Sequence, residues 1–518
     1  AANPLVVLPD GTQLQGIKEG SVSAFRGIRF AQPPINTLRW APPRPWVNPN
    51  ISEVVDTTSF GHTCKQVLWG DDGLFSADHG SEDCLFLNVY VNLDIQSASG
   101  DEKDLLPVGV FVHGGSYVTG ASSLPLYDGV DAVEFWKGRA IIVTTNYRLN
   151  VFGFLGSEEL RSQDPDSRST GNQGIQDQRL AFDWVRRNIQ AFGGDPKRVT
   201  IFGESAGAGS MSNHLTMKRS WGLFNSVVAE SGAFYEGCTQ NMSNAEWTYQ
   251  NLLRSTNCLD LPCLLNKTTD EIFSVSLKLP CNDSTVYPNP FSPTADGVEI
   301  NTHPWIALSN GEVADVPIML GTNADEGAIF TYVPHTIGEE ALHEHWRRVN
   351  GYSTKEIHQL DALYVTDVTY PEGHASKYWY AAERTTGDRV FSCPSKYAAQ
   401  TLGSLQSSAA RTHNTWMYHF EHHPRNADYT RHVSELEYVF HQTELLKHEN
   451  DMQMADVVSS YWASFFSSQD PNSGAVGQSP LPTWPVYQSS QDNLLAMVEA
   501  DEISVVTGLK EQECSFHI

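Results

Sequence analysis

The sequence predicts an α/β protein with a central, mostly parallel, twisted sheet, helices on both faces and an antiparallel hairpin at the N-terminus. Short apolar runs rich in Val and Ile alternate with segments of helical periodicity, which is the pattern of strands joined by helical crossovers. The chain also contains no internal repeat and no low-complexity linker. These observations favour one continuous α/β unit.

The antiparallel strands come first along the chain. Residues 5–8, 13–17 and 21–30 have the composition of strands, and a turn at residues 9–12 separates the first two. The strands predicted for the main sheet are 108–112, 141–146, 199–202, 226–230, 317–320 and 415–420. Between them, residues 172–188 repeat apolar side chains with a period close to 3.6, and residues 206–215 suit the start of a helix.

The charge balance excludes several classes of function. The chain has 61 Asp and Glu against 34 Lys and Arg, which gives a formal net charge of −27. Binding to nucleic acids or to anionic membranes depends on clusters of basic residues, and the sequence has none. No apolar run approaches the roughly 20 residues that a membrane-spanning helix needs. We therefore expect no nucleic-acid partner and no membrane anchor.

Cysteines and glycosylation sequons indicate an oxidising compartment. No Cys-x2-Cys pair or Cys/His cluster has the spacing of a metal site, so we expect no bound metal. Four Asn-x-Ser/Thr sequons begin at Asn50, Asn241, Asn266 and Asn282. An even number of cysteines suits four disulfides, and no signal peptide heads the sequence, so we expect a mature secreted protein with N-linked glycans. The eight cysteines are Cys64, Cys84, Cys238, Cys258, Cys263, Cys281, Cys393 and Cys514.

The strongest functional signal is a nucleophile motif at Ser205. The β-branched run 199–202 leads into Gly203-x-Ser205-x-Gly207, and a helix of small residues follows. A serine on a sharp strand-to-helix turn presents its hydroxyl to a substrate, and the flanking glycines remove side chains that would clash. The helix N-terminus favours the negative charge that develops during acyl transfer. A tight turn with an incidental serine is the alternative.

A second motif supplies hydrogen-bond donors. The strand 108–112 ends in His113-Gly-Gly-Ser116, and acyl transfer needs backbone N–H groups aimed at the developing oxyanion. This loop, together with the N–H of Ala206 after the nucleophile, can supply them. By itself the loop could equally be a plain glycine turn, but its pairing with the Ser205 motif favours the functional interpretation.

Several motifs in order resemble the type-B carboxylesterase family, the carboxylesterase, cholinesterase and fungal-lipase branch of the α/β-hydrolases. The resemblance covers nearly the whole chain and implies the α/β-hydrolase fold, ester hydrolysis and no cofactor. The matching segments are 25–34, 81–88, 113–116, 146–148 with 153–155, 171–174 with 177–179, and 203–207.

The resemblance implies a triad of Ser205 as nucleophile, Glu326 as acid and His432 as base. The order Ser, Glu, His along the chain agrees with the rule for these hydrolases. The residues alone do not choose between Glu326 and its neighbour Asp325. They also leave several other histidines open as the base, namely His413, His419, His422, His423 and His441.

The same resemblance implies that the N–H groups of Gly115, Ser116 and Ala206 form the oxyanion hole. Ser116 departs from the family pattern, which usually has a third glycine, so acyl preference is left open. Glu204 and Ser231 resemble groups that orient the histidine rather than catalysts.

The resemblance also assigns disulfides and buried ion pairs. It pairs Cys64–Cys84, Cys258–Cys263 and Cys393–Cys514, which leaves Cys238–Cys281 as the fourth. It further implies the buried ion pairs Arg148–Asp177 and Arg39–Glu82.

The loop between Cys64 and Cys84 bears on the substrate. It is short and carries Asp71, Asp72 and Asp78, whereas fungal lipases of this family have a longer amphipathic lid there. Cholinesterases have an ammonium-binding Trp ten residues before the second Cys, where this chain has Leu74. The loop therefore favours an esterase over a lipase or a choline esterase, and the net charge of −27 favours neutral over anionic esters.

We thus expect one catalytic domain over residues 1–518 that acts as a secreted serine hydrolase on small, neutral carboxylic esters. A triacylglycerol lipase with interfacial activation is the main alternative. A non-catalytic adhesion-type homologue is a weaker one, because the residues of the triad are all present.

Overall fold

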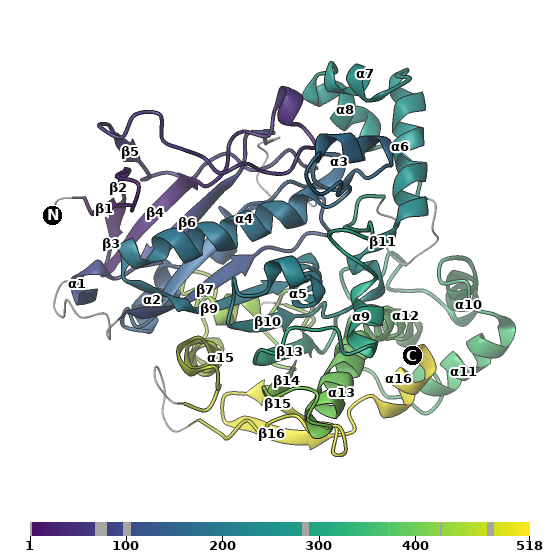
Figure 1. Ribbon diagram of the computed structural model, residues 1–518. Coiled ribbons are helices and arrows are strands. Elements are labelled where there is room, and N and C mark those ends of the chain that lie inside the picture. Colours follow the sequence, from purple (N-terminus) through teal and green to yellow (C-terminus); the bar gives the residue numbers. More distant parts are fainter. Residues whose placement is uncertain are drawn as a thin grey trace.

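A computed structural model describes residues 3–67, 80–96, 105–281, 290–371, 373–424, 427–473 and 481–518. The strands of its main sheet are β3 (Ile17–Glu19), β4 (Val22–Arg29), β6 (Phe86–Val91), β7 (Leu106–Val112), β8 (Ile141–Thr145), β9 (Gly194–Glu204), β10 (Ser226–Glu230), β13 (Ile318–Asn323), β14 (Thr415–Phe420), β15 (Asn493–Glu499) and β16 (Glu502–Thr507). These 11 strands lie in the order β16-β15-β14-β13-β10-β9-β7-β8-β6-β4-β3 (Figure 1).

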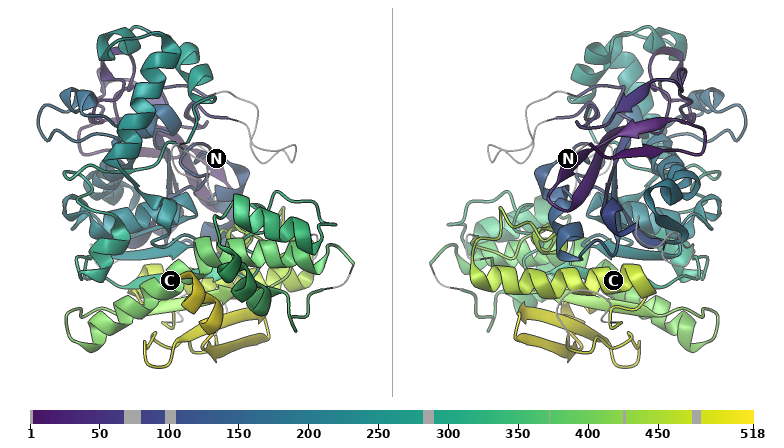
Figure 2. Two further views of the ribbon diagram at one scale, coloured as in Figure 1. Left: turned by 90° about the vertical axis from the view of Figure 1, so that its right-hand side faces the viewer. Right: turned by 90° about the vertical axis from the view of Figure 1, so that its left-hand side faces the viewer.

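The centre of the sheet is parallel and its two ends are antiparallel. Every neighbouring pair from β8 across to β15 is parallel. β16 is antiparallel to β15, and β3, β4, β6 and β8 form antiparallel pairs at the other end. Figure 2 shows the β15–β16 hairpin (yellow) at the bottom of the molecule and the N-terminal strands (purple) above it.

The predicted strand 13–17 is divided between two sheets. β2 (Gln13–Gln15) pairs with β1 (Leu5–Val7) and β5 (Val54–Asp56) in a separate three-stranded sheet, whereas β3 belongs to the main sheet. Gly16 lies at the break, where a Cβ atom would approach the Ala24 carbonyl oxygen to 2.6 Å. The chain can cross from one sheet to the other here because glycine has no side chain.

Helices cover both faces of the main sheet. α4 (Gln173–Asn188), α5 (Ala206–Thr216) and α13 (Cys393–Ser407) pack on one face, and α2 (Val130–Phe135), α14 (Leu436–Val439) and α15 (Glu449–Ser468) pack on the other. The remaining helices are α1 (Leu93–Gln96), α3 (Asn150–Phe154), α6 (Met242–Thr256), α7 (Leu261–Leu265), α8 (Thr269–Ser276), α9 (Pro304–Ser309), α10 (Glu339–Arg348), α11 (Thr354–Tyr364), α12 (Lys377–Gly387) and α16 (Glu511–His517).

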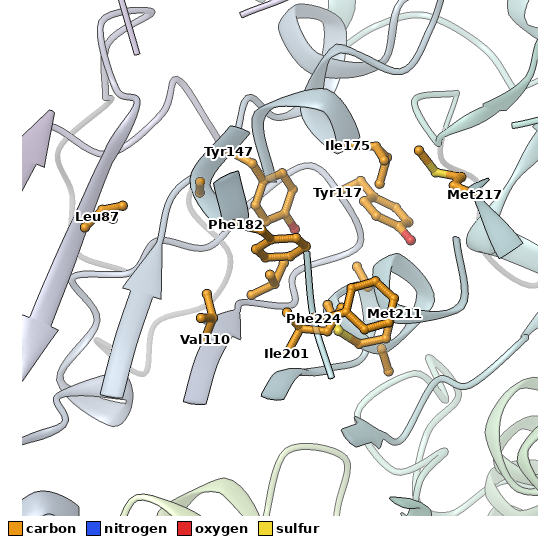
Figure 3. Close-up of a cluster of buried hydrophobic side chains, with 14 of the residues drawn as sticks. Leu87, Val110, Tyr117, Tyr147, Ile175, Phe182, Ile201, Met211, Met217 and Phe224 are labelled. Atoms are coloured by element: carbon orange, nitrogen blue, oxygen red, sulfur yellow. The ribbon is translucent and has the colours of Figure 1, made fainter. Parts of the chain in front are cut away.

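The protein has two large hydrophobic cores, one on each face of the main sheet, because side chains alternate along the central strands. In β7, Val108, Val110 and Val112 face α4 and α5, whereas Phe111 faces α15. Figure 3 shows the first of these cores, where Val110 and Phe182 lie among the labelled side chains. Because successive side chains of a strand point to opposite faces, a strand covered on both sides is apolar throughout.

Two buried ion pairs confirm the pairs that the sequence predicted. Arg148 donates from Nε and Nη2 to both carboxylate oxygens of Asp177, each at 2.8 Å, and Asp177 is fully buried. Arg39 makes the equivalent two-point contact with Glu82, at 2.7 and 2.6 Å. The first pair ties the start of α4 to the loop that follows β8, and the second ties the N-terminal segment to the residues just before β6.

The disulfides agree with the sequence analysis for six of the eight cysteines. Cys64–Cys84, Cys258–Cys263 and Cys393–Cys514 are bonded. The prediction of a fourth bond between Cys238 and Cys281 is wrong, because both are free thiols in the structure. Cys238 is fully buried against α5 and next to His303, whereas Cys281 is half-buried at the edge of a cavity, so the two side chains face different surroundings.

The Arg148–Asp177 pair should contribute strongly to stability. Replacing Asp177 by Asn leaves a buried guanidinium without its counter-charge, which costs about 3–5 kcal/mol. We expect a marked fall in the midpoint of urea unfolding. The control is Glu344→Gln, which breaks the exposed pair with Arg347 and should change the midpoint little. Equal effects of the two substitutions would contradict the assignment.

Candidate active site

Ser205 lies at the sharp turn between β9 and α5. Its backbone has φ 59° and ψ −122°, a region that residues with a side chain rarely occupy. The Ser205 N–H donates to the Glu230 carbonyl oxygen at 2.9 Å, which fixes the turn against the end of β10. The strand–turn–helix context expected for Ser205 is therefore present.

Glycines allow the backbone segments around this turn to approach closely. A Cβ atom on Gly207 would lie 2.1 Å from the Val112 carbonyl oxygen, and one on Gly203 would lie 2.6 Å from the same atom. A Cβ atom on Gly232 would lie 2.5 Å from the Ser205 carbonyl oxygen. Since real Cβ contacts are never this short, a larger residue at any of these positions would push the Ser205 turn away from its neighbours.

His432 contacts Glu326. Nδ1 of His432 lies 2.6 Å from Oε2 of Glu326, and both side chains are almost completely buried. The other Glu326 oxygen accepts a 2.6 Å hydrogen bond from the backbone N–H of Asn323. The carboxylate is thus held in one orientation and can fix the tautomer of the imidazole.

The geometry distinguishes Glu326 from Asp325. Asp325 turns the opposite way, where it accepts from the Thr430 N–H at 2.9 Å and from Arg384 Nη2 at 2.5 Å. Its carboxylate therefore serves an ion pair and a backbone contact, while the neighbouring Glu326 faces the imidazole.

The competing histidines have other partners or lie on the surface. His413 contacts Asp315, His422 contacts Asp451, and His441 contacts Asp456. His419 contacts Thr322, and burial lowers its pKa to about 3. His423 is exposed.

Glu204 meets the other side of the His432 ring. Its Oε1 lies 3.0 Å from His432 Nε2, yet neither Nε2 nor the two Glu204 carboxylate oxygens make a hydrogen bond of acceptable geometry within the described residues. Burial, and then the charges of Glu435 and Glu326, raise the pKa of Glu204 well above its usual value. Glu204 and Glu326 thus lie on opposite sides of the imidazole, at Nε2 and Nδ1 respectively.

Further buried carboxyl groups lie behind the histidine. Ser231 Oγ donates to Glu435 Oε1 at 3.1 Å, and Asn323 Nδ2 donates to Glu435 Oε2 at 2.5 Å. Trp462 Nε1 donates to Glu230 Oε1 at 2.6 Å. Ser231 and Asn323 thus contact the two carboxyl oxygens of Glu435, which follows His432 in the chain. Glu230 and Glu435 were not predicted from the sequence, although Glu230 adjoins Ser231 and Glu435 lies close to His432 in the chain.

The loop after β7 lies against the Ser205 turn. A Cβ atom on Gly114 would approach the Ser205 Cβ atom to 2.9 Å. The His113 ring stacks on Tyr147, and the Tyr147 hydroxyl donates to the His113 carbonyl oxygen at 2.9 Å. Burial lowers the pKa of His113 to about 4, so this histidine is a neutral support for the loop. Gly115 and Ser116 follow on this loop, and Ala206 is the first residue of α5.

Ser205 opens into a cavity of about 730 Å³. One part of the cavity is lined by the aromatic side chains of Tyr117, Tyr235, Trp305 and Phe391. Polar side chains near the N-terminus of α6 line another part. A cavity of this size and composition suits a small organic substrate.

Two phenylalanines pack on the His432 ring, and the sequence did not reveal them. The ring centroid of Phe391 lies 4.3 Å from that of His432, and the centroid of Phe330 lies 5.0 Å from it. Phe391 belongs to a π-helical turn, Asp388–Ser392, between α12 and α13. Such turns occur often at functional sites, but they have no periodicity that a sequence reveals.

The structure describes the asparagines of three of the four predicted glycosylation sequons. Asn50, Asn241 and Asn266 are exposed. Asn282 lies outside the described residues, as does most of the loop between Cys64 and Cys84, including Asp71, Asp72, Leu74 and Asp78. In the described part of the chain, no group of three or more His, Cys, Asp or Glu is arranged to hold a metal ion.

Comparisons with known proteins agree on one family. The sequence profile of the carboxylesterase family matches residues 3–517. A cholinesterase of Mus musculus is 30% identical over 550 residues, which cover 96% of this chain and 83% of the relative. A para-nitrobenzyl esterase of Bacillus subtilis (strain 168) is 30% identical over 502 residues, covering 94% and 93%. A solved structure of a PNB esterase matches with a TM-score of 0.80 at 27% identity and covers 100% of both chains. The structural match confirms the predicted fold class.

The contacts of Glu326 and Asp325 lead to a paired prediction. Glu326→Gln should lower kcat for ester hydrolysis by about 10⁴-fold, because an amide can stabilise the wrong tautomer and cannot stabilise an imidazolium. Asp325→Asn should retain most of kcat per folded molecule. The measurement is kcat corrected by active-site titration. A larger loss in Asp325→Asn would identify Asp325 as the acid instead.

Glu230 should make stability depend on pH. Burial and the nearby Glu435 raise the pKa of Glu230 well above its usual value of 4.5. Above pH ~4.5 the unfolded chain has released this proton and the folded chain has kept it, so stability falls as pH rises through this window. Glu230→Gln, which can still accept from Trp462, should flatten this fall by up to about 1.4 kcal/mol per pH unit.

The measurement is urea unfolding of both proteins from pH 5 to pH 8. Glu312→Gln, at an exposed position, is the control and should leave the slope unchanged. If Glu230→Gln has the slope of the unsubstituted protein, Glu230 does not retain a proton in the folded state.

Proposed function

Because the chain belongs to the carboxylesterase family, we propose that its carboxylic-ester hydrolase activity uses Ser205, His432 and Glu326 as a catalytic triad. The contact between Glu326 and His432 beside the Ser205 turn carries this proposal. It brings together residues that lie far apart in the sequence, and their order along the chain, Ser, Glu, His, is that of these hydrolases.

The geometry supports the following acylation step. His432 Nε2 accepts the proton of the Ser205 hydroxyl as Oγ attacks the carbonyl carbon of the ester. Glu326 accepts the hydrogen bond from Nδ1–H of His432 and stabilises the imidazolium that forms. The N–H groups of Gly115, Ser116 and Ala206 bind the oxyanion of the tetrahedral intermediate.

Collapse of the intermediate breaks the bond to the alcohol. His432 gives its proton to the leaving alkoxide oxygen, and an ester between the acyl group and Ser205 remains. His432 then accepts a proton from water, whose oxygen attacks this ester. The acid product leaves, and the proton returns to Ser205. No cofactor enters these steps.

We further propose that the protein is a secreted enzyme that acts on neutral esters. Three disulfides support an oxidising compartment, and exposed asparagines at three sequons support N-linked glycans. The net charge of −27 disfavours anionic substrates. Within the described residues, no helix is long and apolar enough to cross a membrane.

We also propose that residues 1–518 form one catalytic domain. Strands from Ile17 to Thr507 join a single sheet, and the triad residues follow three of its strands, β9, β13 and β14. An adhesion-type protein without activity is disfavoured, because all the groups that acyl transfer needs are present.

The first test is Ser205→Ala. Removing the nucleophile should abolish hydrolysis of p-nitrophenyl esters, with at least a 10³-fold loss of kcat, while circular dichroism and thermal unfolding stay close to those of the unsubstituted protein. Undiminished hydrolysis by a folded Ser205→Ala protein would refute the mechanism.

The substrate class is tested by rates across p-nitrophenyl esters from acetate to palmitate, with and without detergent micelles. A maximum at short acyl chains supports the esterase. An abrupt increase above the micelle threshold supports the lipase alternative.

A further inference from the structure

The loop that carries the proposed oxyanion donors is strained over three residues in a row. Gly115, Ser116 and Tyr117 have φ values of 107°, 54° and 62°. Two of them carry side chains, and a left-handed conformation costs free energy for such residues. A segment of this kind keeps its shape only when surrounding groups hold it in place.

The loop makes some of its own supporting contacts. The N–H groups of Val118 and Thr119 both donate to the Gly115 carbonyl oxygen at 3.0 Å, which closes a turn directly after the donors. These bonds define the turn, but they do not fix it relative to Ser205. That requires contacts from other segments.

Gln66 supplies such contacts to the far end of the turn. Its Oε1 accepts from the Gly120 N–H at 2.9 Å and from the Thr119 hydroxyl at 2.8 Å. Its Nε2 donates to the Gly120 carbonyl oxygen at 3.0 Å and to the Cys64 carbonyl oxygen at 3.0 Å. The side chain is 6% exposed, so water does not replace these bonds.

The segment from which Gln66 projects is itself fixed. Cys64 is bonded to Cys84, and the Lys65 N–H donates to the Ser81 carbonyl oxygen at 3.1 Å. The amide of Gln66 therefore connects the base of the disulfide-closed loop to residues 119–120.

Asn150 holds the middle of the same turn from another direction. Its backbone N–H donates to the Tyr117 carbonyl oxygen at 2.7 Å. Its side-chain Nδ2 donates to the Lys65 carbonyl oxygen at 2.7 Å, so Asn150 also reaches the segment that carries Gln66. The turn after the oxyanion donors is thus held by the side-chain amide of Gln66 and by the backbone N–H of Asn150.

We propose that Gln66 is a positioning residue that sets the placement of the Gly115 and Ser116 N–H groups relative to Ser205. This inference rests on the proposed function, in which those N–H groups bind the oxyanion. Gln66 acts through Thr119 and Gly120, and it takes no part in substrate binding.

Loss of this contact should weaken transition-state binding more than ground-state binding. A displacement of about 1 Å in a catalytic group can cost 10²-fold in rate, and loss of one oxyanion donor costs about 10²–10³-fold. We expect Gln66→Met, which keeps the length of the side chain and removes both polar atoms, to lower kcat about 10–100-fold. KM should stay within about twofold.

The experiment measures kcat, KM and the inhibition constant of phenylboronic acid, which forms a tetrahedral adduct with a serine nucleophile. All values are corrected by active-site titration. Affinity for the boronic acid should fall by a factor similar to that of kcat. The control is Gln442→Met, because Gln442 is equally buried and donates to the carbonyl oxygens of Leu126 and Asp128. It should lower stability without changing kcat or boronic-acid affinity.

A second pair of variants covers the case in which Gln66→Met does not fold. Thr119→Val removes the hydroxyl that donates to Gln66 and keeps the shape of the side chain. It should lower kcat and boronic-acid affinity together, and Thr119→Ser, which keeps the hydroxyl, should restore both relative to Thr119→Val.

Two results would overturn the proposal for Gln66. One is a folded Gln66→Met or Thr119→Val protein with unchanged kcat and unchanged boronic-acid affinity. The other is a rise in KM with constant kcat, which would indicate a role in substrate binding. If Ser205→Ala keeps full activity, the proposed function fails instead, so the two failures are distinguishable.

Discussion

The structure depends on the close approach of four backbone segments around Ser205. The end of β7, the turn after β9, the start of α5 and the end of β10 pack so tightly that Gly114, Gly203, Gly207 and Gly232 have no room for a Cβ atom. This packing forces Ser205 into a rare backbone conformation and presents its side chain to the cavity. The parallel sheet supplies the rigidity that maintains this conformation, since strained residues persist only within well-packed surroundings.

The electrostatics of the site follow from burial. Several carboxyl groups lie close together behind His432, and water does not screen them. Burial raises the pKa of Glu204, Glu230 and Glu435, so most of this cluster can stay neutral while Glu326 pairs with the imidazole. A site with several buried negative charges and one histidine would be unstable. Burial has the largest effect on the pKa of Glu435, and the hydrogen bond that Glu435 accepts from Asn323 opposes it.

The sequence predicted the central strands and the Ser205 turn well, because both rest on local patterns of apolar residues and glycines. It did not distinguish Glu326 from Asp325 without the family resemblance, since neighbouring side chains point in different directions and only the folded chain shows which one meets the imidazole. Phe391 was missed because a π-helical turn has no sequence period. The prediction of a disulfide between Cys238 and Cys281 was wrong. It paired the two cysteines left over from the other three disulfides, which assumes that every cysteine forms a disulfide.

The central claim is that Ser205 is an activated nucleophile. The most direct measurement treats the native protein with diethyl p-nitrophenyl phosphate, which phosphorylates activated serines, and locates the modification by peptide mass spectrometry. The account predicts one diethylphosphoryl group per molecule, on Ser205, with loss of esterase activity in proportion to labelling. Stoichiometric labelling of a different residue, or complete inactivation with Ser205 unmodified, would contradict it.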